Sequence, residues 1–198
     1  MRESYRASLE YGKVVVREFL RGSRTGYEAH WEQYLNARPG EPVETRVGLE
    51  RLRELGAGAI RVPEGFELQR GVARVVGERR RMLAGDMPLD WGMAEILAYA
   101  TLLDEGFGVR LSGQDSIRGT FAHRHAAYHD QQTFASHIPL TELFDGQPRF
   151  EVINSLLSEL AVLGFEYGYA TSMPGTLVIW EAQFGDFANG AQMVIDQF

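Results

Sequence analysis

The sequence predicts an α/β fold in which a helical region precedes a doubly wound parallel sheet. Two observations carry this prediction. Residues 47–83 place apolar side chains at helical spacing, whereas residues 91–198 alternate short apolar runs with amphipathic stretches joined by short connections. Such alternation is typical of a parallel sheet with helices on both faces.

The first part of the chain is predicted to be short elements joined by polar turns. A helix is expected at residues 5–11 and a strand at residues 13–20, followed by an irregular stretch at residues 21–45 that is rich in Gly, Arg and Pro.

Two helices are then expected, at residues 47–55 and 66–83. Gly56 and Gly85 follow them at the position where glycine commonly ends a helix. We expect residues 1–88 to form a mostly helical linker or subdomain that packs on the rest of the protein.

The second part carries the sheet. Helices are expected at residues 91–105, 158–170 and 188–197, and strands at residues 109–111, 150–153 and 176–180. In parallel sheets ligands bind beyond the carboxyl ends of the strands. We therefore expect a site formed by residues 112–118, 154–159 and 181–187.

Composition excludes several classes of function. The 198 residues contain no cysteine, which excludes disulfides, thiolate metal sites and thiol catalysis. The net charge of −7 disfavours nucleic-acid binding, and we interpret the cluster Arg79–Arg81 as a solvated helix face. The sequence shows no membrane-spanning run and no signal peptide at its start, so a cytoplasmic location is expected.

Four histidines gather in one polar region beside two aspartates. They are His123, His125, His129 and His137, beside Asp115 and Asp130. The spacing lacks the His-Glu-x-x-His pattern of zinc hydrolases, so the region favours a polar active-site loop or surface histidines over a metal site. No nucleotide-binding glycine motif and no G-x-S-x-G nucleophile motif occurs.

Two further places have both an ordinary and a functional interpretation. Ser158 is a good helix N-cap, and it places Glu159 in a first turn where acidic residues are common for structural reasons alone. Phe184 and Phe187 are either core aromatics at helical spacing or rings that stack on a planar ligand.

Several long strings resemble one family. They are Leu157-Ser158-Glu159 with residues 161–169, then 180–192, together with 90–95, 99–106, 110–116, 118–121 and 123–126. They are similar to the thiamine-diphosphate-dependent decarboxylating component of 2-oxoglutarate dehydrogenase. The resemblance extends more loosely through the N-terminal half.

The resemblance implies a part of a longer enzyme. Residues 89–198 are expected to be the N-terminal, incomplete part of a transketolase-like pyrimidine-binding domain, a truncated doubly wound sheet. A preceding domain would bind the diphosphate and Mg²⁺, and this chain would begin after it and stop at Phe198 inside the second domain.

The resemblance also assigns roles to residues. Glu159 is expected to hydrogen-bond the pyrimidine nitrogen and so activate the cofactor, and Phe187, with Phe184 as its neighbour, is expected to stack on the pyrimidine. The remaining expected positions are Gln114, Asp115 and Gln131 near the cofactor, and His123 and His125 for the dicarboxylate substrate.

The implied reaction is oxidative decarboxylation of 2-oxoglutarate in the tricarboxylic acid cycle, with succinyl transfer to a lipoyl group on a dihydrolipoyl succinyltransferase. The implied assembly is a homodimer formed through the pyrimidine-binding domain. The alternatives are an inactive chain that only pairs with full-length subunits, and a related 2-oxoadipate dehydrogenase or 2-oxoglutarate carboligase.

Three positions depart from the family pattern. Leu160 stands where a second glutamate is common, Ile117 where glycine is usual, and Ala122 where a larger or polar residue is common.

Overall fold

A computed structural model describes residues 29–34, 40, 42–188 and 190–197, without the side chain of Phe187. The helix and strand expected at residues 5–11 and 13–20 lie outside the described residues. The chain divides into two compact units, residues 1–30 and 31–198, and everything below concerns the second.

The second unit alternates helices with short strands in the expected order. The helices are α2 (Leu49–Ala59), α3 (Arg70–Ala84), α4 (Trp91–Asp104), α5 (Glu159–Ser172) and α6 (Gly190–Gln197), with 3-10 turns η2 (Glu32–Tyr34), η3 (Pro139–Thr141) and η4 (Asp186–Ala188). The strands are β1 (Gly108–Gly113), β2 (Tyr128–His129), β3 (Ser136–His137), β4 (Phe150–Asn154) and β5 (Thr176–Glu181).

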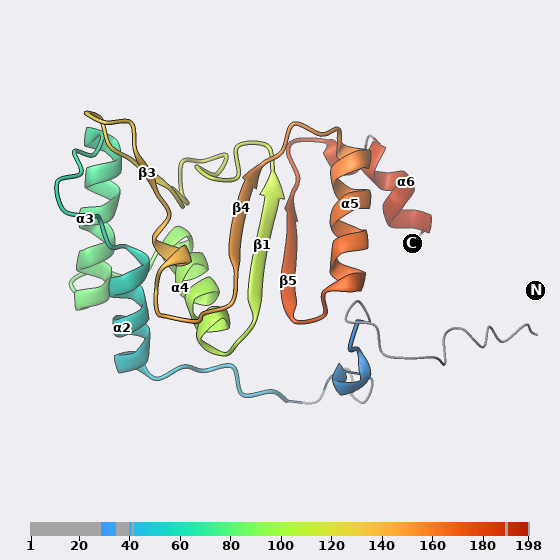
Figure 1. The fold of residues 1–198 in the computed structure, drawn as a ribbon, viewed down its shortest axis with the longest axis horizontal. Helices are drawn as coiled ribbons and strands as arrows, with labels where there is room; N and C mark the ends of the chain where they lie inside the picture. Colours follow the sequence, from blue (N-terminus) through green and yellow to red (C-terminus); the bar gives the residue numbers. More distant parts are fainter. Residues whose placement is uncertain (1–28, 35–39, 41, 189, 198) are drawn as a thin grey trace, which may run out of the picture. The chain divides into compact units, whose positions relative to one another are not determined.

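Three of these strands form a parallel sheet in the order β4-β1-β5 (Figure 1). Gly113, the last residue of β1, pairs with Asn154 on one side and with Glu181 on the other. The three carboxyl ends therefore meet at one edge, which confirms the expected parallel sheet and brings the segments that follow the strands together.

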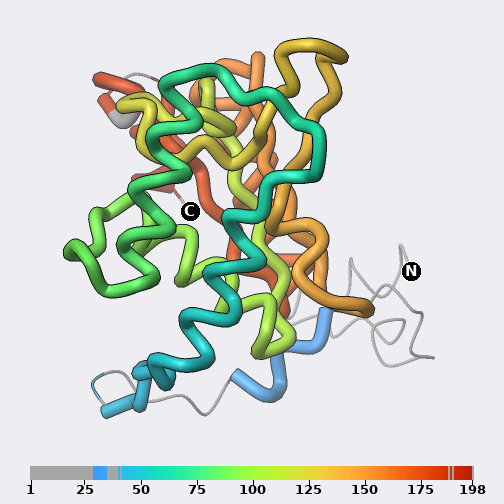
Figure 2. Tube along the Cα trace, turned by 90° about the vertical axis from the view of Figure 1, so that its left-hand side faces the viewer, coloured from blue at the N-terminus to red at the C-terminus, as the bar shows by residue number. Residues whose placement is uncertain are grey.

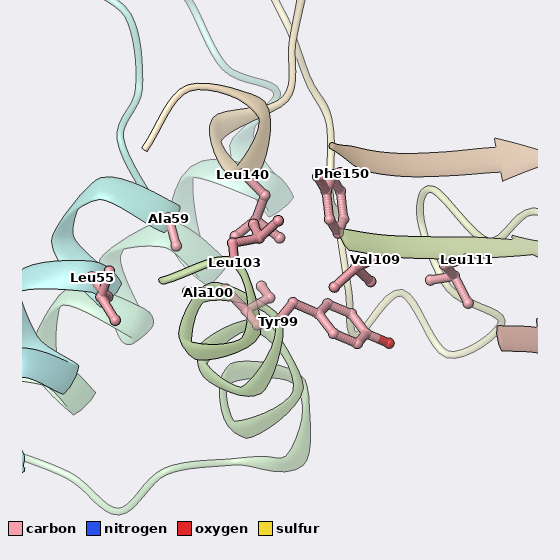
Figure 3. Close-up of a cluster of buried hydrophobic side chains, with 10 residues drawn as sticks. Leu55, Ala59, Tyr99, Ala100, Leu103, Val109, Leu111, Leu140 and Phe150 are labelled. Atoms are coloured by element: carbon pink, nitrogen blue, oxygen red, sulfur yellow. The ribbon is translucent and has the colours of Figure 1, made fainter. Parts of the chain in front are cut away.

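One face of the sheet is covered by α4. Alternate side chains of β1, Val109 and Leu111, point to this face and pack with Phe150 of β4 and with Tyr99 and Leu103 of α4 (Figure 3). The Tyr99 and Phe150 rings lie 6.0 Å apart between centroids. This apolar layer is the main core. β1 lies at its centre and is buried along its whole length.

The opposite face is covered by α5, through a buried ion pair rather than an apolar layer. Arg110 donates from Nε to Glu166 Oε2 at 2.7 Å and from Nη2 to Glu166 Oε1 at 2.9 Å. Its guanidinium also lies over the Tyr169 ring, 4.6 Å from the centroid. Helices on both faces make the sheet doubly wound.

The helical region before the sheet packs on α4 rather than standing apart. In Figure 2 α2 and α3 lie in front of the strands. Leu55 and Ala59 of α2 belong to the same buried cluster as the sheet. The boundary between residues 88 and 89 stays a prediction.

One of the two expected helix ends is wrong. Gly85 ends α3 in the left-handed conformation, as expected. Gly56, however, lies inside α2, which continues to Ala59. A Cβ at Gly56 would lie 2.5 Å from Leu83 Cδ2 and 3.0 Å from Leu97 Cδ2, so this glycine allows close helix packing instead of ending the helix.

Candidate functional site

The site lies at the carboxyl edge of the sheet, where backbone contacts join the three expected segments. Ser155 N donates to Gly113 O at 2.8 Å, and Ile117 N donates to Asn154 Oδ1 at 2.9 Å. A Cβ at Gly113 would lie 2.4 Å from Glu181 O, so the first segment can approach β5 this closely only with glycine there.

Arg124 is the main connector of this edge. Its Nε and Nη2 donate to the two Glu95 carboxylate oxygens at 2.5 and 2.9 Å, and its Nη1 donates to Glu181 Oε2 at 2.5 Å and to Ser116 O at 2.7 Å. Burial alone would lower the Arg124 pKa, but the hydrogen bonds to both carboxylates raise it above its ordinary value. The buried guanidinium therefore stays charged and ties α4 to the end of β5.

The loop of residues 114–127 separates two pockets. The first, which we call the His123 pocket, has a volume of about 530 Å³. It is lined by Glu95, Tyr99, Thr120, Phe121, His123, Arg124, Glu181, Gln183 and Phe184, with apolar residues of β1 and β5. It opens on the same side of the sheet as α4.

The second, which we call the His125 pocket, has a volume of about 440 Å³. Its polar lining is Gln69, Asp115, Arg118, His125, His129, Gln131 and Asn154. Burial lowers the pKa of His125, and the charges of Arg79 and Arg118 lower it further. The His125 imidazole is thus predominantly neutral at pH 7, able to donate one hydrogen bond and accept another.

Five of the expected site residues line these pockets, whereas Glu159 and Gln114 line neither of them. Asp115, Gln131 and His125 line the second pocket, whereas His123 and Phe184 line the first. The structure therefore does not bring His123 and His125 together.

The conformation of this loop explains the division. Asp115, Ala122 and His125 have positive φ angles of 54°, 51° and 43°. Residues other than glycine rarely adopt this region of φ. At His125 this backbone turn directs the side chain into a different pocket from that of His123. Ile117, which replaces the usual glycine, is not among the residues with positive φ, so its β-branched side chain is compatible with the loop.

Glu159 is the first residue of α5, as expected, and is half-buried. Its carboxylate has no hydrogen-bond or ion-pair partner among the residues that the structure describes. Ser158 occupies the N-cap position with extended backbone, but its side chain makes no capping hydrogen bond, which corrects the expected cap. The Glu159 carboxylate is thus available beside the free N–H groups of the helix end.

The segment expected to carry the stacking rings lies next to this helix start. A Cβ at Gly190 would lie 3.3 Å from Leu160 Cβ, so the beginning of α6 contacts the first turn of α5. Phe187 is in η4, immediately before α6, but its side chain lies outside what the structure describes. Phe184 is 90% exposed, which excludes the core-aromatic interpretation for this residue.

Gln114 is held by the same segment. The amide Nε2 of Gln183 donates to Gln114 O at 3.2 Å and to Thr120 Oγ1 at 2.7 Å, while Asp186 Oδ2 accepts from Gln183 N at 2.8 Å. Gln183 therefore connects the segment after β5 to the loop after β1.

Sequence reasoning missed two residues that build the site, Arg124 and Glu95, whereas Glu181 and Gln183 lie in the expected segment 181–187. Arg124 meets Glu95 across 29 positions and Glu181 across 57, separations over which a single sequence gives no pairing signal. The interpretation of the arginine cluster was also wrong in part. Arg79 is 1% exposed and faces the site loop, whereas Arg80 and Arg81 are exposed.

No group of three or more metal-ligating side chains gathers within the described part of the chain. Among the same residues, no helix has the length and apolar character needed to cross a membrane.

Comparisons with known proteins give a consistent result. Residues 87–198 match the family described as transketolase, pyrimidine binding domain. The chain is 52% identical over 196 residues to the 2-oxoglutarate dehydrogenase E1 component of Azotobacter vinelandii, covering 99% of this chain and 21% of that protein.

Two more relatives extend the similarity. The chain is 50% identical over 198 residues to the E1 component of Haemophilus influenzae, covering 100% of this chain and 21% of that protein. It is 43% identical over 198 residues to the mitochondrial 2-oxoglutarate dehydrogenase of Schizosaccharomyces pombe, covering 100% of this chain and 19% of that protein. The chain thus spans about a fifth of the length of the curated relatives it matches.

Proposed function

The chain belongs to the transketolase pyrimidine-binding domain family, and from this premise we propose that it provides the pyrimidine-binding part of a thiamine-diphosphate-dependent 2-oxoglutarate dehydrogenase. The observation that carries the proposal is the position of Glu159, an unpartnered carboxylate in the first turn of α5 within a chain similar over its whole length to E1 components.

The donor set at this edge fits an aminopyrimidine ring. A carboxyl group that shares a proton with a ring nitrogen must not be held by another partner, and Glu159 has none among the described residues. An exposed aromatic side chain, Phe184, lies in the segment whose end contacts the same helix turn. We assign ring stacking to Phe187 with Phe184 as its neighbour, and loop contacts to Gln114, Asp115 and Gln131.

When bound, thiamine diphosphate supplies the nucleophilic carbon and the electron sink that decarboxylation requires. The chain supplies orientation and one proton position. Glu159 would share a proton with the pyrimidine nitrogen. The neutral His125 would donate to a substrate carboxylate in the second pocket. His123 lines the first pocket, so the two histidines would not bind the same carboxylate.

The other parts of the proposed reaction lie beyond these residues. Mg²⁺ and the diphosphate would be held by a different domain, and the succinyl group would pass to a lipoyl group on a dihydrolipoyl succinyltransferase. The reaction would belong to the tricarboxylic acid cycle and the protein to the cytoplasm. The names of the relatives favour 2-oxoglutarate over 2-oxoadipate as substrate.

Glu159→Ala and Glu159→Gln test the assignment in the enzyme that contains this chain. Both variants are expected to lower kcat by about 100-fold or more, because a positioned acid–base group contributes roughly 10²–10⁴ to the rate. Turnover is measured with 2-oxoglutarate and an artificial electron acceptor, which removes the dependence on the succinyltransferase.

The matched control is Glu105→Gln, which changes an exposed carboxylate at the end of α4 and should keep the parent rate. Unchanged turnover in Glu159→Gln would reject the role of Glu159. Parallel assays with 2-oxoadipate decide the substrate, because the parent enzyme is expected to prefer 2-oxoglutarate.

A further inference from the structure

Arg79 is a buried arginine on a helix whose neighbouring arginines are exposed. It lies on α3, is 1% exposed, and donates from Nη2 to His123 O at 2.8 Å and to Arg124 O at 2.6 Å. Its Nη1 is also buried and makes no hydrogen bond within the described residues. The next residue, Arg80, is exposed.

The charge of Arg79 has no carboxylate partner within ion-pair distance among the described residues. The groups that face it are the two carbonyl dipoles and the hydroxyl of the buried Tyr128, none of which carries a compensating negative charge. Burying a cation that has no paired carboxylate costs free energy, because the charge loses its hydration. Folding stability alone therefore gives a weak reason for arginine at this position.

The two carbonyls belong to the point where the site loop changes direction. The His123 side chain enters one pocket and the His125 side chain enters the other, with Arg124 between them. His125 has a φ of 43°, a conformation that costs energy and needs support from its surroundings. Nη2 of Arg79 supplies that support, because it donates to the two carbonyls immediately before His125.

We propose that Arg79 is a positioning residue for the site loop: by holding the carbonyls of His123 and Arg124 it directs His125 into its pocket and presents Arg124 to Glu95 and Glu181. The catalytic relevance of this role rests on the proposed function. The helical region before the sheet would thus act on the site through one side chain.

Arg79 also acts on His125 through its charge. The groups that lower the His125 pKa are, after burial, Arg79, Arg118 and His123, while Asp115 raises it. The other side chains of α3 and its N-cap that line this pocket, Val72 and Gln69, are uncharged. Removing the Arg79 charge should therefore raise the His125 pKa towards its ordinary value, even where burial is unchanged.

The test compares Arg79→Met and Arg79→Lys with the control Arg80→Met, using the full chain. The His125 ring signals are followed by NMR against pH. In Arg79→Met the midpoint should rise by a measurable fraction of a pH unit. Arg79→Lys keeps the charge but not the guanidinium, so its midpoint should stay closer to the parent value. The midpoint should not change in Arg80→Met.

The backbone signals of residues 123–125 give the second readout. They should move in both Arg79 variants, because Met has no donor and the Lys ammonium ends one bond short of the Nη2 position. They should stay in place in Arg80→Met. An unchanged midpoint and unchanged backbone signals in either folded Arg79 variant would overturn the proposal. If Arg79→Met does not fold, Arg79→Lys decides alone by its backbone signals.

Activity of the enzyme containing the chain adds a third readout. Arg79→Lys is expected to lower kcat/KM for 2-oxoglutarate by about tenfold, with Arg80→Met unaffected. The NMR measurements do not require turnover, so the positioning role stays testable even if the Glu159 assignment fails. Conversely, unchanged loop signals in the Arg79 variants would reject the positioning role without affecting the assignment of Glu159.

Discussion

At the scale of single residues, a buried ion pair fixes α5 on the face of the sheet opposite the apolar core. Arg110 and Glu166 form a bidentate pair between β1 and α5, and Glu151 approaches the same guanidinium at 3.3 Å. Glu166 lies seven positions after Glu159 on the same helix. The pair therefore fixes α5 on the sheet and, through the helix, the position of its first turn.

Asp130 makes the stability of the domain depend on pH. It is buried; its Oδ1 accepts from Glu67 N at 2.7 Å and its Oδ2 from Thr133 N at 2.9 Å. The Thr133 hydroxyl and the Glu67 amide lower its pKa from 3.8 to about 2. Because the folded-state pKa is depressed, the stabilisation is complete above pH 4 and is lost as the pH falls towards 2.

We therefore expect the free energy of unfolding to decrease between pH 4 and pH 2, and to decrease less steeply in Asp130→Asn. Urea unfolding at several pH values measures both slopes. The exposed Asp145→Asn serves as the control and should keep the slope of the parent. Equal slopes in the parent and Asp130→Asn would show that Asp130 does not carry this linkage.

At the scale of elements, the sequence predicted what depends on local pattern. The strands β1, β4 and β5 and the helices α4 and α5 lie where apolar periodicity placed them, and Gly85 ends α3 as expected. The start of α3 was predicted too early: residues 66–69 precede the helix, because Leu68 pairs with Asp130 and Gln69 caps α3. Local pattern failed where a distant neighbour decides. Gly56 continues α2 because Leu83 and Leu97 pack against it, and the two-residue strands β2 and β3 are too short to show a period.

The site was predictable to a similar degree. The order of the elements predicted a site beyond the carboxyl ends of the strands and placed Glu159 in the first turn of a helix. The resemblance alone assigned a role to Glu159. The burial of Arg79 and the bridges of Arg124 were not predictable, because they depend on which helix face meets the loop at residues 123 and 124.

Two glycines in helices allow this packing to be tested. A Cβ at Gly92 of α4 would lie 2.3 Å from His123 O, a backbone atom that cannot rotate away, whereas a Cβ at Gly77 of α3 meets nothing within 4 Å. Gly77→Ala should stabilise the fold by about 0.5–1 kcal/mol, because alanine has the higher helix propensity.

Gly92→Ala should instead destabilise the fold by roughly 1–3 kcal/mol, because overpacking outweighs the gain in propensity. Thermal and urea unfolding of the two variants measure the difference. Stabilisation by both substitutions would show that the backbone at His123 shifts easily to make room for a methyl group on α4, which would argue against a rigid site loop.

At the scale of the whole molecule, apolar side chains remain exposed around the beginning of α5 and on α6. Leu156, Leu157, Leu160, Met193 and Ile195 are exposed. Exposed apolar clusters of this kind mark association surfaces. Two-fold symmetric dimers are the commonest homo-oligomers. We propose that this surface, which adjoins Glu159, forms the homodimer contact.

Association between two such copies must overcome charge repulsion. The chain carries a net charge of −7, with the acidic excess in residues 91–198. Added salt screens this repulsion while leaving the apolar attraction intact, so we expect the dimer to become more stable as ionic strength rises. Sedimentation velocity over a range of protein and salt concentrations measures the dissociation constant.

Leu156→Glu places a charge in the proposed contact and should weaken the dimer at least about tenfold, equivalent to roughly 1.4 kcal/mol. Phe134→Glu is the matched control, because Phe134 is also a highly exposed apolar residue but lies in the turn between β2 and β3. Its dimer should be unchanged. A chain that stays monomeric at every concentration, or equal weakening by both substitutions, would contradict an interface at this surface, since the apolar side chains around Glu159 would then have no role in self-association.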